Sequence, residues 1–337
     1  MQPTNSQPKT EPYQVSPPPQ EAISAILSLP LRQLLKKVNL DWKELQEIRL
    51  SQARPLTLWY RGRETFLTED GYETGSPKSA HQVTAQELRE TLEFAGAYSL
   101  YAYEDEIRQG YLTLPGGHRI GVTGKAVTEN GQVKTLRYIT SLNIRVAHEV
   151  KGCADAVLPW LYSSEGLCHT LLISPPRCGK TTLLRDLIRQ ISNGRTGFRG
   201  MRVGVVDERS EIGGSHLGVP GLDVGVRTDI LDGCPKAEGM MMLVRSMSPE
   251  LIAVDEIGGN ADMEAMENAI SCGCRILATV HGSSLEEIRQ KPLVSGLLQT
   301  GIFERFVVLD ARQGPGTVRA ILDGKGKILC SKSQAPA

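Results

Sequence analysis

The sequence lacks an excess of charge of either sign, because 38 lysines and arginines balance 38 aspartates and glutamates. The chain as a whole therefore has no general electrostatic attraction to nucleic acid or to anionic lipid. Aromatic residues are also few, with five phenylalanines and three tryptophans. Single-stranded nucleic acid is bound in basic grooves lined with aromatic side chains, so both shortages argue against nucleic acid as a partner.

Long apolar runs are absent as well. No segment approaches the ~18 apolar residues that a membrane span requires, and no charged start followed by an apolar stretch suggests a signal peptide. The seven cysteines are scattered without a C-x-x-C pair, which indicates a reducing compartment. We therefore expect a cytoplasmic protein that reaches a membrane only peripherally, through partner proteins.

Changes in composition divide the chain into four parts. Residues 1–20 are rich in Pro, Gln, Ser and Thr, which predicts a disordered tail. Residues 21–150 combine helical periodicity with strand pairs and predict a small α+β domain. Residues 151–325 alternate short apolar runs with helical segments, as in a mainly parallel sheet covered by helices on both faces. Residues 326–337 are expected to form a second tail.

A phosphate-binding loop follows the first apolar strand of the second domain. The strand ends at Ile173, and a Gly-Lys-Thr sequence then opens an amphipathic helix, which is the context of a P-loop. A chance Gly-Lys-Thr at a helix start is the alternative. Loop amides and the helix N-terminus attract phosphate oxygens, Lys180 adds a positive charge at the β- and γ-phosphates of ATP, and the Thr181 hydroxyl ligates Mg²⁺. The expected nucleotide-binding residues are Ser174, Pro175, Pro176, Arg177, Cys178, Gly179, Lys180, Thr181 and Thr182. Ser174 stands where the motif has its first glycine.

Two carboxylates follow another apolar strand, Leu251–Val254. Ligands of open α/β sheets bind at the carboxyl ends of the strands, which is where Asp255 and Glu256 are expected. Asp255 would hold the Mg²⁺ shell through water. Glu256 would orient or deprotonate the attacking water. A solvated strand end is the alternative, and two adjacent carboxylates make it the weaker one.

Two further strands end in polar residues. The run Val203–Val206 leads into Asp207 and Glu208, so Glu208 is a rival for the catalytic base, or a structural partner of Arg209. His281 ends a third strand and could sense the γ-phosphate, although a structural histidine is an equal alternative. The arginines considered for stabilising charge, in cis or in trans, are Arg227, Arg245 and Arg275, with Arg119 and Arg145 as weaker candidates.

Several longer runs match one family closely. They are residues 116–127 (GGHRIGVTGKAV), 141–147 (SLNIRVA), 151–155 (KGCAD), 174–186 (SPPRCGKTTLLRD) and 232–242 (DGCPKAEGMMM). On these runs the chain resembles the stage III sporulation protein AA family over about residues 20–325. Ser174 is part of that family's pattern, so it does not count against the phosphate loop.

The resemblance implies an ATPase of endospore-forming bacteria that acts in the mother cell, at the channel to the forespore. The wider family is similar to the ring ATPases of type II and type IV secretion and of pilus systems. On that likeness Asp207 and Glu208 match an acidic box, which supplies the base in those enzymes. Asp255 and Glu256 match the Walker B strand, and His281 matches a histidine box.

The sequence thus predicts an α/β protein: a RecA-like P-loop NTPase domain with a mainly parallel sheet, preceded by a smaller α+β domain. The expected function is hydrolysis of ATP to ADP and phosphate, with Mg²⁺, by a homo-oligomeric ring such as a hexamer. Its expected partners are membrane proteins of a sporulation channel. Two alternatives stay open. One is a RecA-like DNA-handling motor, and the other is a scaffold that binds ATP without turnover.

Overall fold

The computed structural model describes residues 17–96, 107–108, 110–291, 296, 298, 301–312 and 316–331. Contacts between residues divide the chain into two units, Met1–Ala147 and His148–Ala337, here called unit 1 and unit 2. Residues 1–16, most of the expected N-terminal tail, lie outside the described residues, and the first helix begins at Pro19. No helix in the described part of the chain is both long enough and apolar enough to span a membrane.

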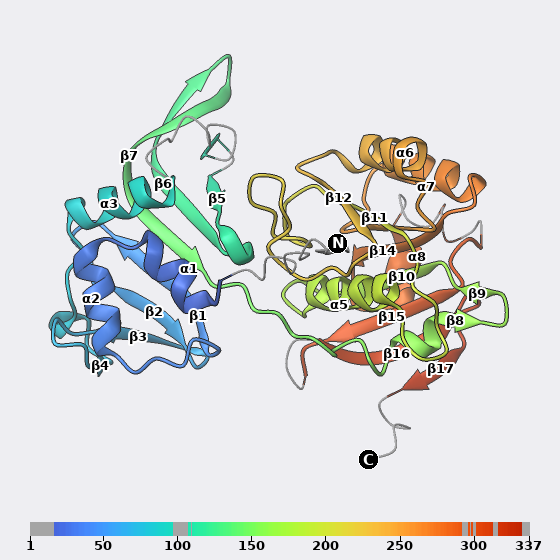
Figure 1. Ribbon diagram of the computed structural model, residues 1–337, viewed down its shortest axis with the longest axis horizontal. Coiled ribbons are helices and arrows are strands. Elements are labelled where there is room, and N and C mark those ends of the chain that lie inside the picture. Colours follow the sequence, from blue (N-terminus) through green and yellow to red (C-terminus); the bar gives the residue numbers. More distant parts are fainter. Residues whose placement is uncertain are drawn as a thin grey trace, which may run out of the picture. The chain divides into compact units, whose positions relative to one another are not determined.

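Unit 1 is built on a seven-stranded antiparallel sheet in the order β4-β3-β2-β1-β7-β6-β5 (Figure 1). Its buried core joins the sheet to three helices, α1, α2 and α3. The elements are α1 (Pro19–Ile26), α2 (Leu29–Lys37), β1 (Leu45–Ser51), β2 (Thr57–Tyr60), β3 (Arg63–Leu67), β4 (Glu73–Thr74), α3 (Ala85–Ala95), β5 (Tyr111–Thr113), β6 (Arg119–Glu129) and β7 (Gln132–Arg145), with 3₁₀ turns at Pro77–Ser79 and Pro115–Gly117.

Local signals in unit 1 explain where its elements begin and turn. Pro30 lies in the first turn of α2, where its missing N–H breaks no helical bond, so the helical run is split just before it. Thr84 caps α3 in a capping box with Glu87. A hairpin turn joins β5 to β6, and Gly116 there has a φ of 83°, which suits glycine.

Unit 2 contains an eight-stranded sheet in the order β12-β11-β13-β14-β10-β15-β16-β17. Strands β12 to β15 of this order are parallel, and β16 and β17 add antiparallel strands at one edge. The elements are β8 (Tyr162–Ser163), β9 (Gly166–Leu167), β10 (Thr170–Ser174), α5 (Lys180–Asn193), β11 (Val203–Asp207), β12 (Thr228–Asp232), α6 (Lys236–Met247), β13 (Leu251–Val254), α7 (Asn260–Ser271), β14 (Arg275–His281), α8 (Leu285–Gln290), β15 (Arg305–Asp310), β16 (Thr317–Asp323) and β17 (Ile328–Ser331), with a 3₁₀ helix at Leu158–Leu161.

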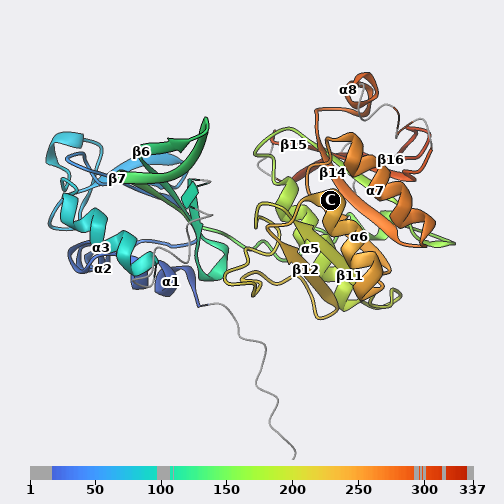
Figure 2. The ribbon, with the colours of Figure 1, turned by 90° about the horizontal axis from the view of Figure 1, so that it is seen from above.

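Helices cover both faces of this sheet (Figure 2). Side chains of β10 alternate between two apolar clusters, with Leu171 and Ile173 in one and Leu172 in the other. The first cluster includes α6, α7 and α8, and the second includes α5. Burial on both faces is why these strands read as continuous apolar runs in the sequence.

The end of the chain differs from the expectation. A tail was predicted from residue 326, but Ile328–Ser331 forms β17 and pairs with β16. The prediction was wrong for these residues, because a short edge strand takes its backbone hydrogen bonds from a neighbouring strand and needs little periodicity of its own.

Candidate active site

The predicted phosphate-binding loop, here called the phosphate loop, connects the end of β10 to the start of α5. Gly179 has a φ of 80° and Arg177 a φ of 60°, so two residues of the loop lie in the left-handed region. Glycine adopts this conformation freely, whereas an arginine is strained there, and such strain is typical of functional loops. Within the described part of the chain, the main-chain N–H groups of residues 177–180 donate to no acceptor. They are available to an anion at the start of α5.

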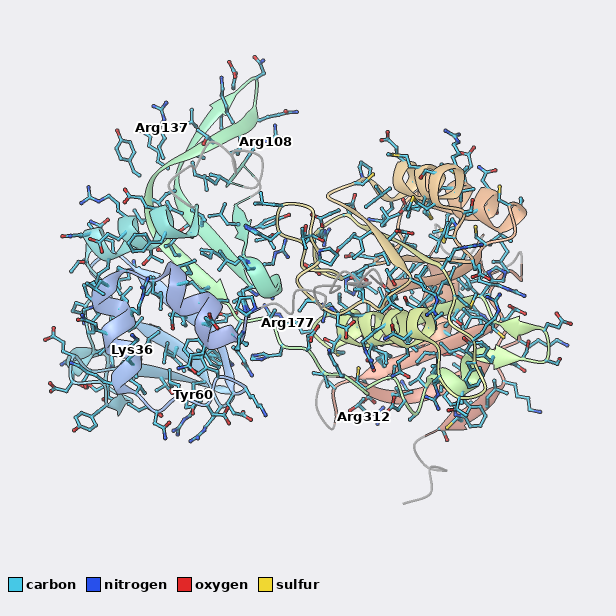
Figure 3. All side chains as sticks on the ribbon, viewed as in Figure 1. Lys36, Tyr60, Arg108, Arg137, Arg177 and Arg312 are labelled. Atoms are coloured by element: carbon cyan, nitrogen blue, oxygen red, sulfur yellow. The ribbon has the colours of Figure 1, made fainter. Side chains whose placement is uncertain are left out.

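The remaining loop residues hold this shape. Ser174 ends β10 in full burial, and its hydroxyl donates to the Pro175 carbonyl at 2.9 Å. The buried Cys178 thiol donates to the Pro176 carbonyl at 3.5 Å. The Arg177 side chain is exposed (Figure 3). The two prolines, which have no N–H, thus receive hydrogen bonds at their carbonyl groups and restrict the loop further.

Lys180 and Thr181 both contact the same carboxylate. The Lys180 Nζ atom lies 2.9 Å from Asp255 Oδ1, and the Thr181 hydroxyl donates to Asp255 Oδ2 at 3.0 Å. Lys180 is only 8% exposed. Asp255 comes directly after β13, which is separated from β10 by β14 in the sheet. The fold therefore brings together the predicted phosphate-binding lysine and the two predicted Mg²⁺-binding residues.

Thr279 of β14 is a third donor to Asp255, which sequence reasoning missed. Its fully buried hydroxyl donates to Asp255 Oδ1 and accepts the main-chain N–H of Glu256 at 2.8 Å. Burial is the largest influence on Asp255 and raises its pKa, but the Lys180 charge and the hydrogen bonds from Thr279, Lys180 and Thr181 together lower the pKa below its usual value. Asp255 is thus held as a carboxylate. A polar residue within the apolar run of β14 was the available signal.

Glu256 has a φ of 52°, which turns its side chain away from the line of β13. One carboxylate oxygen lies 3.4 Å from His281 Nε2, and the other lies 3.2 Å from an Arg209 guanidinium nitrogen. The His281 Nδ1 atom is 3.4 Å from the Ser174 carbonyl oxygen. His281 therefore contacts both the start of the phosphate loop and Glu256.

Asp207, the last residue of β11, is 2% exposed and accepts the main-chain N–H groups of Glu211, Ile212 and Gly213. Burial is the dominant influence and raises the pKa of Asp207 to about 6, although these hydrogen bonds act in the opposite direction. Asp207 therefore fixes the loop that follows β11.

Glu208, the residue after Asp207, forms an ion pair with Lys236 at the start of α6. A small hollow is lined by Glu208, Glu256 and Asp255 together with Arg209 and Lys236. Both candidate bases therefore border the same space, and each is held by a cation that sequence reasoning did not assign to it.

Three of the arginines considered for the site lie at the opposite edge of the sheet. Arg275 begins β14, the strand that ends at His281, so about 20 Å separates the two at ~3.3 Å per residue. Arg227 immediately precedes β12 and donates to the Ser192 carbonyl at 2.8 Å. Arg245 lies in the last turn of α6, a helix whose first residue, Lys236, is beside Glu208. None of the three reaches the phosphate loop of its own chain, because parallel strands place their two ends at opposite edges.

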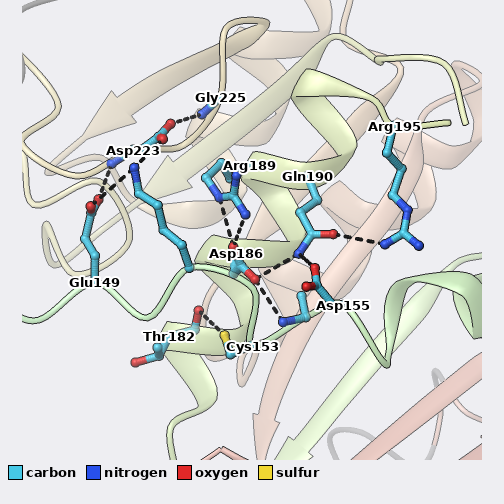
Figure 4. Close-up of polar contacts among 12 residues, drawn as sticks. Glu149, Cys153, Asp155, Thr182, Asp186, Arg189, Gln190, Arg195, Asp223 and Gly225 are labelled. Carbon is cyan, nitrogen blue, oxygen red and sulfur yellow. Dashed lines mark hydrogen bonds and ion pairs between the residues drawn. The ribbon is translucent and has the colours of Figure 1, made fainter.

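A polar network fixes α5 behind the phosphate loop (Figure 4). The buried Asp186 accepts the main-chain N–H of Ala154 at 2.8 Å and pairs with Arg189 at 2.6 Å. The Cys153 thiol donates to the Thr182 carbonyl at 3.7 Å. Burial raises the pKa of Cys153 to about 12, so this thiol is not a nucleophile. The network orients the helix whose N-terminus carries Lys180.

Comparison with known proteins assigns the chain to a family. The sequence profile of the family described as "Sporulation stage III, protein AA" matches residues 18–329. The chain belongs to this family. Stage III sporulation protein AA of Bacillus subtilis (strain 168) is 41% identical over 308 residues, which are 91% of this chain and 96% of that protein. The protein SEEDLING PLASTID DEVELOPMENT 1 of Arabidopsis thaliana is 30% identical over 191 residues, 56% of this chain and 26% of that protein. The family resemblance read from the sequence is confirmed.

Solved structures agree on the fold. The Legionella pneumophila ATPase DotB matches with a TM-score of 0.55 and 14% identity, over 88% of this chain and 79% of that one. The pilus retraction motor PilT, in a structure with bound ADP, matches with a TM-score of 0.50 and 12% identity, over 83% and 77% of the two chains. Such low identity establishes the fold alone, and the predicted RecA-like α/β class is confirmed.

Proposed function

We propose that this chain hydrolyses ATP to ADP and phosphate at the edge where β10, β13 and β14 end. One observation carries the proposal: Lys180 and Thr181 lie against Asp255, which follows a different strand 74 residues after Thr181. The donor-rich loop of residues 177–180 supports it independently. A phosphate loop and a carboxylate in contact at a strand edge are what a P-loop nucleotide hydrolase requires.

Each residue would have a distinct part in ATP binding. The loop N–H groups would hold the α- and β-phosphate oxygens, and Lys180 would turn from Asp255 to the β- and γ-phosphates. No group of three or more His, Cys, Asp or Glu side chains suited to a metal ion occurs among the described residues. The Thr181 hydroxyl and the Asp255 carboxylate fit Mg²⁺, which keeps most of its shell as water and phosphate and would neutralise charge on the phosphates.

The attacking water needs a base at the γ-phosphate. We assign this role to Glu256, because it follows Asp255 directly and contacts His281, which also touches the phosphate loop. His281 would then report γ-phosphate occupancy to Glu256. Glu208 remains the rival, since it borders the same hollow from β11.

We further propose that the active form is a homo-oligomeric ring such as a hexamer. Arg227, Arg245 and Arg275 lie at the edge away from the phosphate loop, so charge stabilisation from any of them would have to come from a neighbouring copy. Membership of a stage III sporulation family favours membrane-protein components of a sporulation channel as partners, with the chain at the cytoplasmic side of that membrane.

Turnover of purified protein tests these proposals. Phosphate release from ATP should need Mg²⁺ and should rise in specific activity with protein concentration, while light scattering shows larger assemblies with ATP. A monomer whose specific activity is independent of concentration would refute the ring. ATP binding without turnover would favour the scaffold, and stimulation of hydrolysis by DNA would favour the DNA motor.

A further inference from the structure

The hairpin of β6 and β7 extends beyond the sheet to which it belongs (Figure 1). β5 pairs with β6 only from Arg119 to Gly121, and β1 pairs with β7 only from Ser141 to Arg145. Between these limits the two strands pair with each other alone. Residues 123–139 therefore form a two-stranded ribbon with two open edges among the described residues.

A two-stranded ribbon gains little stability in water, so its length calls for an explanation. Leu136 and Ile139 pack against the core of unit 1, but most other side chains of the ribbon are exposed. Open strand edges leave main-chain N–H and C=O groups that a further strand can use. A partner strand would supply the missing hydrogen bonds.

A bulge at the base of the ribbon is built around glycine. Tyr138 has a φ of 47° and is 77% exposed. Opposite it, a side chain at Gly124 would lie 2.6 Å from the Arg137 carbonyl oxygen and 2.9 Å from the Tyr138 carbonyl oxygen, so only glycine fits. Bulges redirect side chains and disturb pairing locally, and this one displays an aromatic ring to solvent.

Two cations face each other beside this bulge. Lys125 and Arg137 are directly paired in the register of β6 and β7, and both are exposed. Figure 3 shows Arg137 on the ribbon. Like charges in this position destabilise a strand pair. Neither has an ion pair or hydrogen-bond partner among the residues that the structure describes. Arg137 follows Leu136, so the cations occupy the face opposite the one that packs on the core.

The chemistry of the ribbon selects the class of partner. Its tip, Asn130-Gly131-Gln132, is polar, and Val133 beside it adds one exposed apolar side chain, which is little surface to insert into a lipid bilayer. Its third cation, Lys134, is already paired with Glu129 at 2.7 Å. Lys125, Arg137 and one aromatic ring form a small footprint for nucleic acid, which binds along extended basic grooves. Strand edges left open by the described residues, beside these two exposed cations, fit an extended acidic peptide.

We propose that the ribbon of residues 123–139 is a docking surface for an extended acidic segment of another protein. That segment adds a strand to an open edge and places its carboxylates against Lys125 and Arg137, beside Tyr138. This site lies wholly in unit 1 and does not depend on ATP hydrolysis.

A synthetic peptide tests the proposal on the full chain. The probe is a fluorescent peptide of about twelve residues that alternates glutamate with valine or threonine, long enough to cover one edge. We expect it to bind and to protect main-chain amides of residues 123–139 from hydrogen exchange. The double variant Lys125→Glu, Arg137→Glu should weaken binding by about tenfold or more, and the matched variant Lys134→Glu by less than about twofold.

Circular dichroism establishes that each variant is folded, and the milder pair Lys125→Ala, Arg137→Ala should weaken binding in the same direction. ATP turnover should be the same in all variants. The proposal is overturned if the acidic peptide does not bind, or if Lys134→Glu weakens it as much as the double variant. It is also overturned if phosphatidylglycerol vesicles, or a second copy of the chain, bind with the same dependence on Lys125 and Arg137 while the peptide does not.

Discussion

Glu87 in unit 1 and Asp207 in unit 2 are carboxylates that the fold buries almost completely, at 3% and 2% exposure, but their surroundings differ. Glu87 closes the capping box of α3 and pairs with His81 at 2.9 Å. Asp207 instead accepts three main-chain N–H groups. Burial raises the pKa of both, yet the bonds from His81 and Thr84 bring the pKa of Glu87 below its usual value, whereas that of Asp207 stays raised.

Both carboxylates take these hydrogen bonds from residues within six positions along the chain, so the difference lies in the kind of partner. Glu87 pairs with the His81 imidazole, whereas Asp207 accepts main-chain N–H groups. Parallel strands need long crossovers and collect their carboxyl ends at one edge, so Asp255 meets Thr181 across 74 positions. Unit 2 can therefore assemble a charged site from distant segments, whereas the contacts of Glu87 in unit 1 are local.

The largest expected effect is the loss of ATP turnover in Lys180→Ala, which would show that turnover depends on the charged site of unit 2. Lys180 is the lysine in contact with Asp255 at the phosphate loop, and its loss should reduce ATP turnover by about a thousandfold or more. Lys134→Ala, which removes an exposed ion pair in unit 1, is the matched control and should leave turnover unchanged. Phosphate release and far-ultraviolet circular dichroism measure both. Near wild-type turnover by a folded Lys180→Ala protein would rule out the phosphate loop.

The next largest effects are expected from substituting the two candidate catalytic bases of unit 2, Glu256 and Glu208. Glu256→Gln should retain ATP affinity and lose about a hundredfold or more in turnover, because a general base contributes about 10²–10⁴-fold. Glu208→Gln should lose less, since its carboxylate is engaged with Lys236. Single-turnover hydrolysis and nucleotide-binding titrations separate the two effects. If Glu208→Gln shows the deeper loss with affinity intact, the base is in the acidic box after β11.

The smallest effect concerns stability against pH and compares Asp207 with Glu87. A pKa raised from 3.8 to about 6 means that the contribution of Asp207 is full at low pH and is lost as pH rises through about 6. The stability of the wild type relative to Asp207→Asn should therefore fall by up to about 3 kcal/mol between about pH 4 and pH 7.

Glu87 should behave oppositely, because its pKa is lowered from 4.5. The Glu87 contribution to stability is present above that value and is lost as pH falls through the folded-state pKa. The stability of the wild type relative to Glu87→Gln should therefore increase as pH rises. Calorimetric unfolding of the wild type, Asp207→Asn and Glu87→Gln from about pH 3 to pH 7 gives both slopes, because the Glu87 contribution changes below pH 4.5 and the Asp207 contribution changes up to about pH 6. If relative stability changed with pH in the same direction for both variants, the proposed difference between the two buried carboxylates would be wrong.

Much of the fold could be predicted because its signals are local. Apolar periodicity predicted the helices and the buried strands, and Gly-Lys-Thr after an apolar run predicted the start of α5. Each of these patterns arises within a few residues and reflects backbone geometry. β17 was not predicted, because a four-residue strand shows almost no periodicity.

What only the tertiary structure decided was which distant residues meet. Thr279 is a polar residue within an apolar strand, but its partner Asp255 follows only from the position of β14 between β10 and β13. The partners of Glu256 and Glu208 come from other elements. The direction of β14 places Arg275 at the end of the strand that is far from the phosphate loop. The physical reason is that sequence periodicity specifies which face of an element is buried, whereas strand order and direction are set by long-range pairing and by packing of whole layers.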